Sequence, residues 1–277
     1  MNVDNNAGID VSVIIPTYNR KQKLIDTLRR IDNSQYGARC IELIVVDDGS
    51  TDGTGKSITS AEIDNIELRY MRTPSNLGPA AARNMGIKHS RGEYLYFTDD
   101  DCLPPKHLIN EFADFLDRNP GVAGVGGGLT GITDNWISRF ERFKDKLLGI
   151  PGKGTRIGRD FPSGFTSNMM YRKRVLRETG YFDENFKVPA GEDLELKNRI
   201  AVKYDLAFMP INVVHNHEYD LNYLLGAAIK QGLNKNPPIG VLRRAILLLA
   251  YAPLLACTVI RKIIQYRIFR HRNSPPG

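Results

Sequence analysis

The stretch VSVIIPTYNRKQKLIDTLRRIDNSQYGARCIELIVVDD, residues 11–48, decides the fold class of this chain. It opens with a short apolar run rich in β-branched residues, which is typical of a buried strand. The next segment has Leu24 and Leu28 at helical spacing, and a second apolar run leads into Asp47 and Asp48. A strand, a helix and a second strand in this order predict a βαβ unit with parallel strands.

The same alternation continues along most of the chain. It predicts a Rossmann-like α/β fold, in which a mostly parallel sheet has helices on both faces. The further expected strands are at 66–73, 92–101, 121–128 and 206–217, and the further helices at 78–90, 103–119 and 189–204. Residues 167–186 are expected to form a strand followed by a helix. Residues 126–165 are rich in glycine and remain unassigned beyond the strand that ends at 128.

The composition is that of an ordinary globular domain. Of the 277 residues, 42% are hydrophobic and 25% are charged, which suffices for a sizeable core. The cysteines Cys40, Cys102 and Cys257 lie too far apart for a disulfide framework or a cysteine metal motif, so a reducing, cytosolic setting is expected. The polar opening MNVDNNAGID predicts no signal peptide.

The net charge of +7 is unevenly distributed. No Asp or Glu follows Asp220, whereas nine of the 38 Lys and Arg residues do. A nucleic-acid-binding domain would spread basic residues over its folded surface, whereas basic residues beside apolar ones favour an anionic membrane surface. We therefore expect a membrane contact and no nucleic-acid partner.

Residues 236–277 are expected to form a separate helical, membrane-associated segment after a domain of residues 1–235. Within it, 245–260 carries no charge and is flanked by basic residues, but it is shorter than the ~20 residues of a span and contains Pro253. We interpret it as a helix at the membrane interface. A tilted span and a buried helix pair are the alternatives. The expected location is cytoplasmic, peripheral to the inner face of the cell membrane.

Three adjacent carboxylates, Asp99, Asp100 and Asp101, follow the apolar run in YFTDDDCLPP. Like Asp47 and Asp48, they come at the carboxyl end of a predicted strand, where parallel α/β sheets bind ligands. Clustered carboxylates are tolerated around a hard cation, so a complex of Mn²⁺ or Mg²⁺ with a diphosphate is the favoured interpretation. The alternative is an acidic turn that caps the following helix, which requires only one of the three.

Six motifs follow one another along the chain in this order: VSVIIPTYNR, IELIVVDDGSTDGT, NLGPAAARNMGI, GEYLYFTDDDCLPP, FDENF and GEDLELKNR. Together they resemble family 2 glycosyltransferases of the GT-A fold, over about residues 10–217. The resemblance implies a metal-dependent, inverting transfer of a sugar from a nucleotide-diphosphate donor, expected to be a UDP-sugar, to an acceptor hydroxyl. The QxxRW motif of processive members is missing, so a non-processive enzyme is expected. The expected membrane contact of residues 236–277 favours a glycan or lipid-linked acceptor in surface-polysaccharide assembly.

The resemblance also implies roles for individual residues. The nucleotide would be bound by Pro16, Thr17, Tyr18, Asp48, Arg83, Asp99 and Asp100, with Asp48 at the base, Asp100 near the ribose, and Arg83 and Asn84 shaping the donor pocket. Asp101 would be the direct metal ligand, with Asp99 in the same motif. Asp193 would be the catalytic base beside Glu192. Acids in the first turn of a helix also favour helix formation, and both functions are compatible.

Two histidines in VVHNHEYD, His215 and His217, are the remaining candidates for the metal site. Residues i and i+2 of a strand point to the same side, so both rings could reach one ion. A surface or core position is the alternative. Trp136 and Phe140 could stack on a sugar or lipid, although core packing is the favoured interpretation.

Two other functions compete with sugar transfer. A sugar nucleotidyltransferase would need a glycine-rich phosphate loop after the first strand, and PTYNRKQK contains no glycine. A non-catalytic nucleotide- or sugar-binding module would be expected to have lost some of the carboxylates, but Asp48, Asp99, Asp101 and Asp193 are all present.

Overall fold

The computed structural model describes residues 8–132, 154–159, 166–186 and 191–216. The segment 245–260, the boundary at residue 235, His217, Trp136 and Phe140 lie outside the described residues, so the predictions made for them stay predictions. Among the helices that are described, none is both long enough and apolar enough to cross a bilayer.

The first half of the sheet is the predicted parallel unit. It has the order β3-β2-β1-β4, and all three pairings are parallel. Residues of β1 and β2 are buried almost throughout, which explains why these strands are continuous apolar runs rather than alternating ones. The four strands are β1 (Val11–Thr17), β2 (Ile41–Asp47), β3 (Glu67–Arg72) and β4 (Tyr94–Phe97).

The second half of the sheet is mixed, and here the prediction of a mostly parallel sheet is wrong. The described strands make four parallel and four antiparallel pairings. β8 lies antiparallel between β4 and β6, and β5 and β7 each pair antiparallel with β9. Two reversals restore the direction, so β6 and the adjacent β9 run the same way as β4. The strands are β5 (Cys102–Leu103), β6 (Val122–Gly131), β7 (Arg156–Gly158), β8 (Met169–Arg172) and β9 (Asp205–His215).

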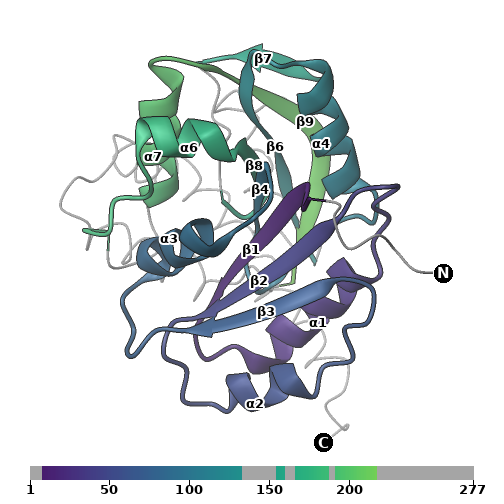
Figure 1. The fold of residues 1–277 in the computed structure, drawn as a ribbon, viewed down its shortest axis with the longest axis vertical. Coiled ribbons are helices and arrows are strands. Elements are labelled where there is room, and N and C mark those ends of the chain that lie inside the picture. The colour runs from purple at the N-terminus through teal and green to yellow at the C-terminus, as the bar shows by residue number, and fades with distance from the viewer. Residues whose placement is uncertain (1–7, 133–153, 160–165, 187–190, 217–277) are drawn as a thin grey trace, which may run out of the picture. The chain divides into compact units, whose positions relative to one another are not determined.

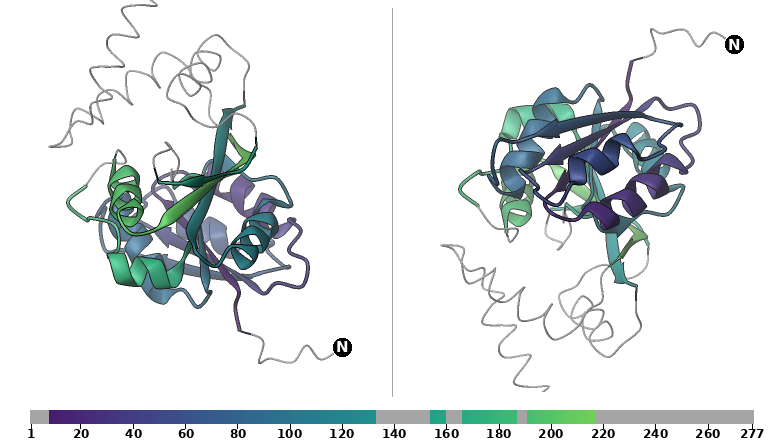
Figure 2. Two further views of the ribbon diagram at one scale, coloured as in Figure 1. Left: turned by 90° about the horizontal axis from the view of Figure 1, so that it is seen from above. Right: turned by 90° about the horizontal axis from the view of Figure 1, so that it is seen from below.

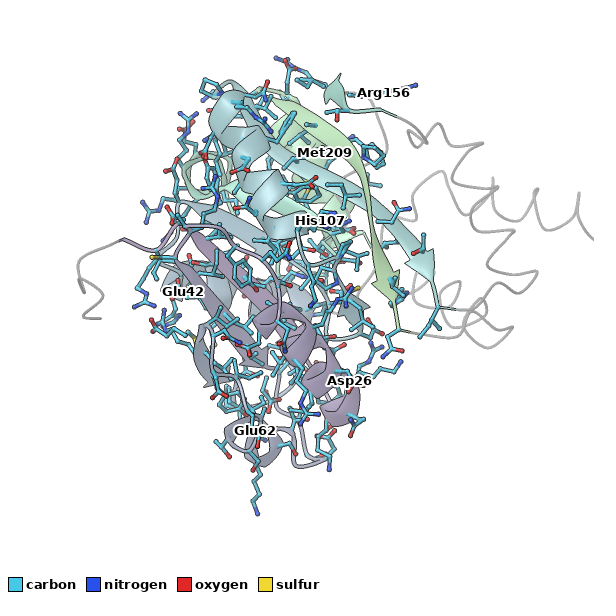
Figure 3. All side chains as sticks on the ribbon, turned by 90° about the vertical axis from the view of Figure 1, so that its right-hand side faces the viewer. Asp26, Glu42, Glu62, His107, Arg156 and Met209 are labelled. Carbon is cyan, nitrogen blue, oxygen red and sulfur yellow. The ribbon has the colours of Figure 1, made fainter. Side chains whose placement is uncertain are left out.

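Helices cover both faces of the sheet, as the sequence predicts (Figures 1 and 2). One core cluster joins Val13 and Ile15 of β1 to α1, α2 and α4, and Met209 of β9 packs against it on the side where α4 lies (Figure 3). A second cluster joins Ile14 of β1 to α3, α6 and α7. The helices are α1 (Lys21–Asp32), α2 (Thr54–Thr59), α3 (Pro79–His89), α4 (Leu108–Arg118), α6 (Lys173–Thr179) and α7 (Glu192–Ala201).

The approach of α3 to β1 depends on Gly86. A Cβ atom at this position would lie 2.6 Å from Cγ2 of the fully buried Ile14, which cannot move aside within the sheet. Overpacking of this kind costs about 1–3 kcal/mol. This exceeds the gain of ~1 kcal/mol that alanine has over glycine in a helix.

We therefore expect Gly86→Ala to lower the free energy of unfolding by about 1 kcal/mol, measured by urea denaturation. Lys88→Ala, on the exposed side of α3, is the control and should stay within about 0.5 kcal/mol of the unmodified chain. A Gly86→Ala variant at least as stable as the unmodified chain would contradict the tight contact.

The sheet brings several strand ends to one edge. Thr17 of β1 is paired with Asp47 of β2, and β4 runs parallel to β1, so the residues that follow these strands emerge together. Because β9 runs in the same direction, its last residue, His215, also reaches this edge. The described part of the chain thus gathers the acidic motifs and His215 at the carboxyl ends of the strands, where open α/β sheets bind ligands.

Candidate active site

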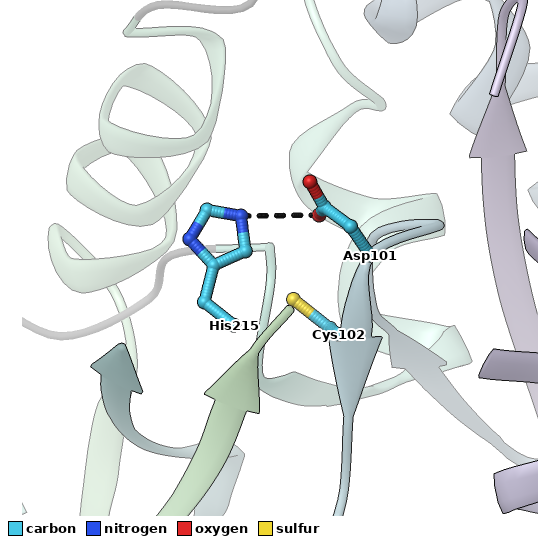
Figure 4. Close-up of side chains that lie close together, drawn as sticks. All are labelled: Asp101, Cys102 and His215. Atoms are coloured by element: carbon cyan, nitrogen blue, oxygen red, sulfur yellow. Dashed lines mark hydrogen bonds and ion pairs between the residues drawn. The ribbon is translucent and has the colours of Figure 1, made fainter. Parts of the chain in front are cut away.

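Asp101 connects β5 to the end of β9. Its Oδ1 lies 3.1 Å from Nε2 of His215, and its Oδ2 accepts a hydrogen bond of 2.6 Å from Nη1 of Arg20 (Figure 4). Cys102, the residue after Asp101, is paired with His215 in the β5–β9 ladder, and this pairing brings the side chains of Asp101 and His215 together. Burial opposes ionisation, but His215, Arg20 and Lys23 outweigh it and lower the pKa of Asp101 to about 2. Asp101 is therefore an ionised carboxylate.

Asp100 points in another direction, toward the end of β1. Thr17 Oγ1 donates to its Oδ2 at 2.8 Å and Arg20 Nη1 to its Oδ1 at 3.1 Å, while Thr27 of α1 binds its backbone carbonyl. Burial raises the pKa of Asp100 to about 6, against the opposing effect of Arg20 and with the repulsion of Asp101. Two adjacent aspartates thus differ in pKa because only Asp101 is paired with the imidazole.

Asp99 is linked to the GEDLELKNR motif through Arg83. The guanidinium of Arg83 donates from Nη2 to Asp99 Oδ1 at 2.9 Å and from Nη1 to Glu192 Oε1 at 2.8 Å. Ser167 holds the other oxygen of Asp99 at 2.7 Å. Arg83 and Glu192 are buried, and Arg83 Nε and Glu192 Oε2 lack a hydrogen-bond partner in the described residues. Unpaired buried polar atoms are costly, so they indicate a place that a ligand or water completes.

Asp193 follows Glu192 at the start of α7 and is partly exposed. Its Oδ1 accepts a hydrogen bond from the backbone N–H of Leu194 at 2.8 Å. Burial and the neighbouring Glu192 carboxylate raise the pKa of Asp193 above the usual range of an aspartate, and the positive charge of Arg83 opposes this shift. A carboxylate with a raised pKa is a stronger base than an ordinary one.

Asp48 organises the loop that leads into α3. Its Oδ1 accepts hydrogen bonds of 2.9 Å from Thr73 Oγ1 and from the N–H of Leu77, and its Oδ2 accepts one of 2.8 Å from the N–H of Gly78. The carboxylate is therefore fixed by its own chain. Its assignment to a nucleobase stays a prediction.

The PTYN motif ends in a turn that exposes its aromatic residue. Pro16 is partly buried and Thr17 is buried, whereas Tyr18 is 44% exposed. Asn19 adopts a left-handed backbone conformation with φ 53°, and its side chain accepts a hydrogen bond from the N–H of Thr51. The turn thus leaves Tyr18 exposed directly after Thr17, which hydrogen-bonds Asp100, and an exposed aromatic ring can stack on a base.

The donor atoms around Asp101 fit a hard or borderline divalent cation. Ligand atoms of Asp101, Cys102 and His215 lie within 4.8 Å of one another, the one such group among the described residues. Burial raises the pKa of the Cys102 thiol well above its usual value, which disfavours the thiolate in the metal-free chain. A carboxylate with an imidazole suits Mn²⁺ and accommodates Mg²⁺. The ligand roles of Asp101, Asp99 and His215 stay predictions.

Sequence reasoning missed Arg20 and Ser167. It expected Asn84 to shape the donor pocket, and that role stays a prediction. Arg20 contacts two of the three clustered aspartates, and its position directly after PTYN at a strand end is the signal that could have found it. Asn84 binds Phe182 through two backbone hydrogen bonds and donates to Glu184 at 2.9 Å, so it ties α3 to the FDENF loop. Nothing in the local sequence marks Ser167.

Residues 12–180 match the sequence profile of the family described as Glycosyl transferase family 2. The chain belongs to this family. Among its curated relatives, glycosyltransferase AglE of Haloferax volcanii is 31% identical over 201 residues, which cover 72% of this chain and 64% of AglE. The uncharacterized glycosyltransferase YfnE of Bacillus subtilis is 33% identical over 51% of this chain and 36% of its own length. The matched part is thus less than two thirds of each relative.

Solved structures share the fold of this family member. The mannosyltransferase PcManGT of Pyrobaculum calidifontis superposes with a TM-score of 0.62 at 21% identity, covering 95% of this chain and 84% of that protein. Staphylococcus aureus TarS superposes with a TM-score of 0.61 at 20% identity, covering 82% of this chain and 40% of TarS. These likenesses show a GT-A-like mixed α/β fold, as the sequence resemblance implies.

Proposed function

We propose that the chain transfers a sugar from a nucleotide-diphosphate donor to an acceptor hydroxyl, with inversion and with the help of Mn²⁺ or Mg²⁺. The observation that carries the proposal is the Arg83 bridge, which joins an acid of the DDD cluster to the acids at the start of α7. One site thereby holds both acids suited to a metal–diphosphate and acids suited to proton transfer. Sugar transfer needs both, since the leaving diphosphate gains charge while the acceptor loses a proton.

The proposed roles follow the chemistry of each side chain. Asp101 and His215 would hold the cation, with Asp99 nearby, and the cation would stabilise the negative charge that develops on the departing diphosphate. Asp193 accepts the proton of the attacking hydroxyl, and the raised pKa favours this transfer. Glu192 orients the Arg83 guanidinium that also holds Asp99. With a single base, the acceptor hydroxyl attacks from the side opposite the leaving group, and this single displacement inverts the anomeric carbon.

A UDP-sugar is the proposed donor. TarS, which has the same fold, was solved in complex with UDP and with UDP-GlcNAc. PcManGT was solved with GDP-Man and Mn²⁺, so a GDP-sugar is the alternative donor, and its Mn²⁺ supports the choice of cation. Tyr18, Asp48 and Asp100 are the proposed contacts to the nucleoside.

Thermal unfolding of the full chain with nucleotides tests this proposal. A ligand that binds only the folded state raises the unfolding temperature, and the effect grows with the ratio of its concentration to its Kd. UDP should stabilise the chain when Mn²⁺ is present and much less when it is absent. UMP, which has the same base and one phosphate fewer, is the matched control and should show little dependence on Mn²⁺. Equal effects of UDP and UMP in both conditions would contradict a metal–diphosphate site.

A lipid-linked glycan at a membrane surface is the proposed acceptor, and it rests on residues 236–277. Removing residues 239–277 is expected to release the chain from vesicles that contain anionic lipid, because nine basic residues follow Asp220 and seven of them are removed with the apolar 245–260. Sedimentation with the vesicles measures this. The truncated chain should still bind UDP and Mn²⁺, which shows that it is folded. Continued sedimentation of a folded, truncated chain would refute the role of residues 239–277 as the membrane anchor.

A further inference from the structure

Arg20 lies between two carboxylates of the acidic cluster. A single nitrogen, Nη1, contacts Asp100 Oδ1 at 3.1 Å and Asp101 Oδ2 at 2.6 Å. The two carboxylates are almost completely buried, whereas the arginine side chain is 43% exposed. A positive charge that is partly open to solvent therefore bridges two acids that are not.

The charge balance of this cluster requires such a cation. Adjacent buried carboxylates repel each other, and a buried charge without a partner is strongly unfavourable. Lys23 also approaches Asp101, with its Nζ 3.9 Å from Oδ2. Arg20 lies closer, and one of its nitrogens contacts both acids at once.

The backbone positions Arg20 for this contact. Asn19 takes the left-handed conformation, and its N–H donates to Ser50 Oγ at 2.9 Å while its side chain holds the N–H of Thr51. Arg20 then caps α1, and its carbonyl accepts the first hydrogen bond of the helix from Leu24. Because the turn is anchored on both sides, the backbone stays fixed while the exposed side chain can rotate away.

The two oxygens of Asp101 are occupied by different partners. Nε2 of His215 lies 3.1 Å from Oδ1, whereas Nη1 of Arg20 donates a hydrogen bond of 2.6 Å to Oδ2. Nη1 of Arg20 lies 2.6 Å from Oδ2, so a divalent cation that used this oxygen would lie close to the guanidinium, and two positive charges at short range repel strongly. Arg20 and the cation therefore compete for the same carboxylate oxygen.

We propose that Arg20 is a built-in counter-cation that neutralises Asp100 and Asp101 in the metal-free chain and is displaced when a divalent cation binds there. The inference rests on the proposed metal-dependent function. Its consequence is that Arg20 weakens the apparent affinity for the cation, because only the fraction of molecules with the arginine displaced is competent to bind. The metal-free chain in turn stays folded without two uncompensated acids.

Direct binding of Mn²⁺ to the full chain tests this inference, with free Mn²⁺ measured by its electron paramagnetic resonance signal. Arg20→Met removes the competing charge, and we expect it to bind Mn²⁺ roughly tenfold more tightly than the unmodified chain, the equivalent of one charged hydrogen bond. Without metal, Arg20→Met should unfold at a lower temperature, and saturating Mn²⁺ should narrow the difference. Arg20→Gln keeps a hydrogen-bond donor without the charge and should also bind Mn²⁺ more tightly.

Arg39→Met is the matched control. Nη2 of Arg39 also contacts two carboxylates, Asp114 at 2.6 Å and Asp117 at 2.5 Å, but these lie on α4 and not at the strand ends. This variant is expected to bind Mn²⁺ as the unmodified chain does. Loss of ion pairs in general is thereby separated from loss of the charge beside Asp101.

The outcomes separate the inference from the function on which it rests. If Arg20→Met and Arg20→Gln bind Mn²⁺ no more tightly than the unmodified chain, the competition is refuted and the metal site stands. If neither the unmodified chain nor any variant binds Mn²⁺, the proposed metal-dependent function fails, and the inference fails with it. Tighter binding by both variants and not by Arg39→Met supports the inference.

Discussion

Replacing Asp193 with asparagine is expected to lower kcat for nucleotide release from the donor by about 10²–10⁴-fold, the usual contribution of a general base. The amide has nearly the same shape as the carboxylate but cannot accept the acceptor's proton. Asp193 makes one hydrogen bond within the described residues, to the N–H of Leu194, and an asparagine oxygen can still accept it. The affinity for UDP with Mn²⁺ should therefore stay unchanged, which separates catalysis from binding.

The pH dependence of the unmodified chain should carry the same signature. A base works only when it is deprotonated, so activity falls as the pH drops through its pKa. Because burial and Glu192 raise the pKa of Asp193, this loss should begin at a higher pH than for an ordinary aspartate. The residual activity of Asp193→Asn should lack this limb of the profile.

Glu195→Gln serves as the control for Asp193→Asn. Glu195 lies in the same first turn of α7, but its carboxylate is paired with Arg199 on the same helix. Its replacement should leave kcat within a factor of about two, because surface pairs of this kind contribute little. A near-normal kcat for Asp193→Asn would show that another group is the base.

Replacing Asp101 with alanine is expected to abolish the stimulation by Mn²⁺ and to lower kcat by about 10²–10³-fold, the range seen when an electrostatic stabiliser of the transition state is lost. Asp101 is the one residue of the acidic cluster that contacts both His215 and Arg20. Without it, the His215 imidazole and the Arg20 guanidinium no longer share a carboxylate between them. Rates measured across a series of Mn²⁺ concentrations, together with direct Mn²⁺ binding, check the expectation.

The control for Asp101→Ala is Asp26→Asn on α1. Asp26 accepts one long hydrogen bond from Gln22 and lies outside the acidic cluster, so neither Mn²⁺ binding nor kcat should change. If Asp101→Ala retained a normal response to Mn²⁺, the cation would have to be held by other residues. In that case Arg20 would be the permanent partner of Asp100, and the competition proposed above would also be wrong.

The sequence was a good guide to the first half of the sheet and a poor one to the second. In β1, β2 and β4, largely apolar runs alternate with helices, and this pattern is typical of a parallel unit. The glycine-rich stretch of β6 has no comparable periodicity, and the reversal at β8 depends on which strand it pairs with. Pairing between distant segments is decided by tertiary packing, which a local pattern does not encode.

The sequence predicted a set of acids at one edge of the sheet, but it did not predict the different partners of the individual acids. The positions of Asp99, Asp100 and Asp101 after β4 follow from the strand pattern. Their three different partners do not, since His215 is brought to Asp101 only by the β5–β9 pairing, 114 residues along the chain. Arg20 was not predicted because the sequence pattern marks the carboxylates and not the cation that neutralises them.

The Arg83 bridge has a consequence for recombining this chain with its relatives. A junction between residues 132 and 166 would join the N-terminal part of this chain to the C-terminal part of a relative. Arg83 and Asp99 would come from one parent and Glu192 from the other. A chimera whose second parent lacks an acid at this position would bury a guanidinium with half of its countercharge missing, so compatibility at residue 192 should govern which hybrids fold.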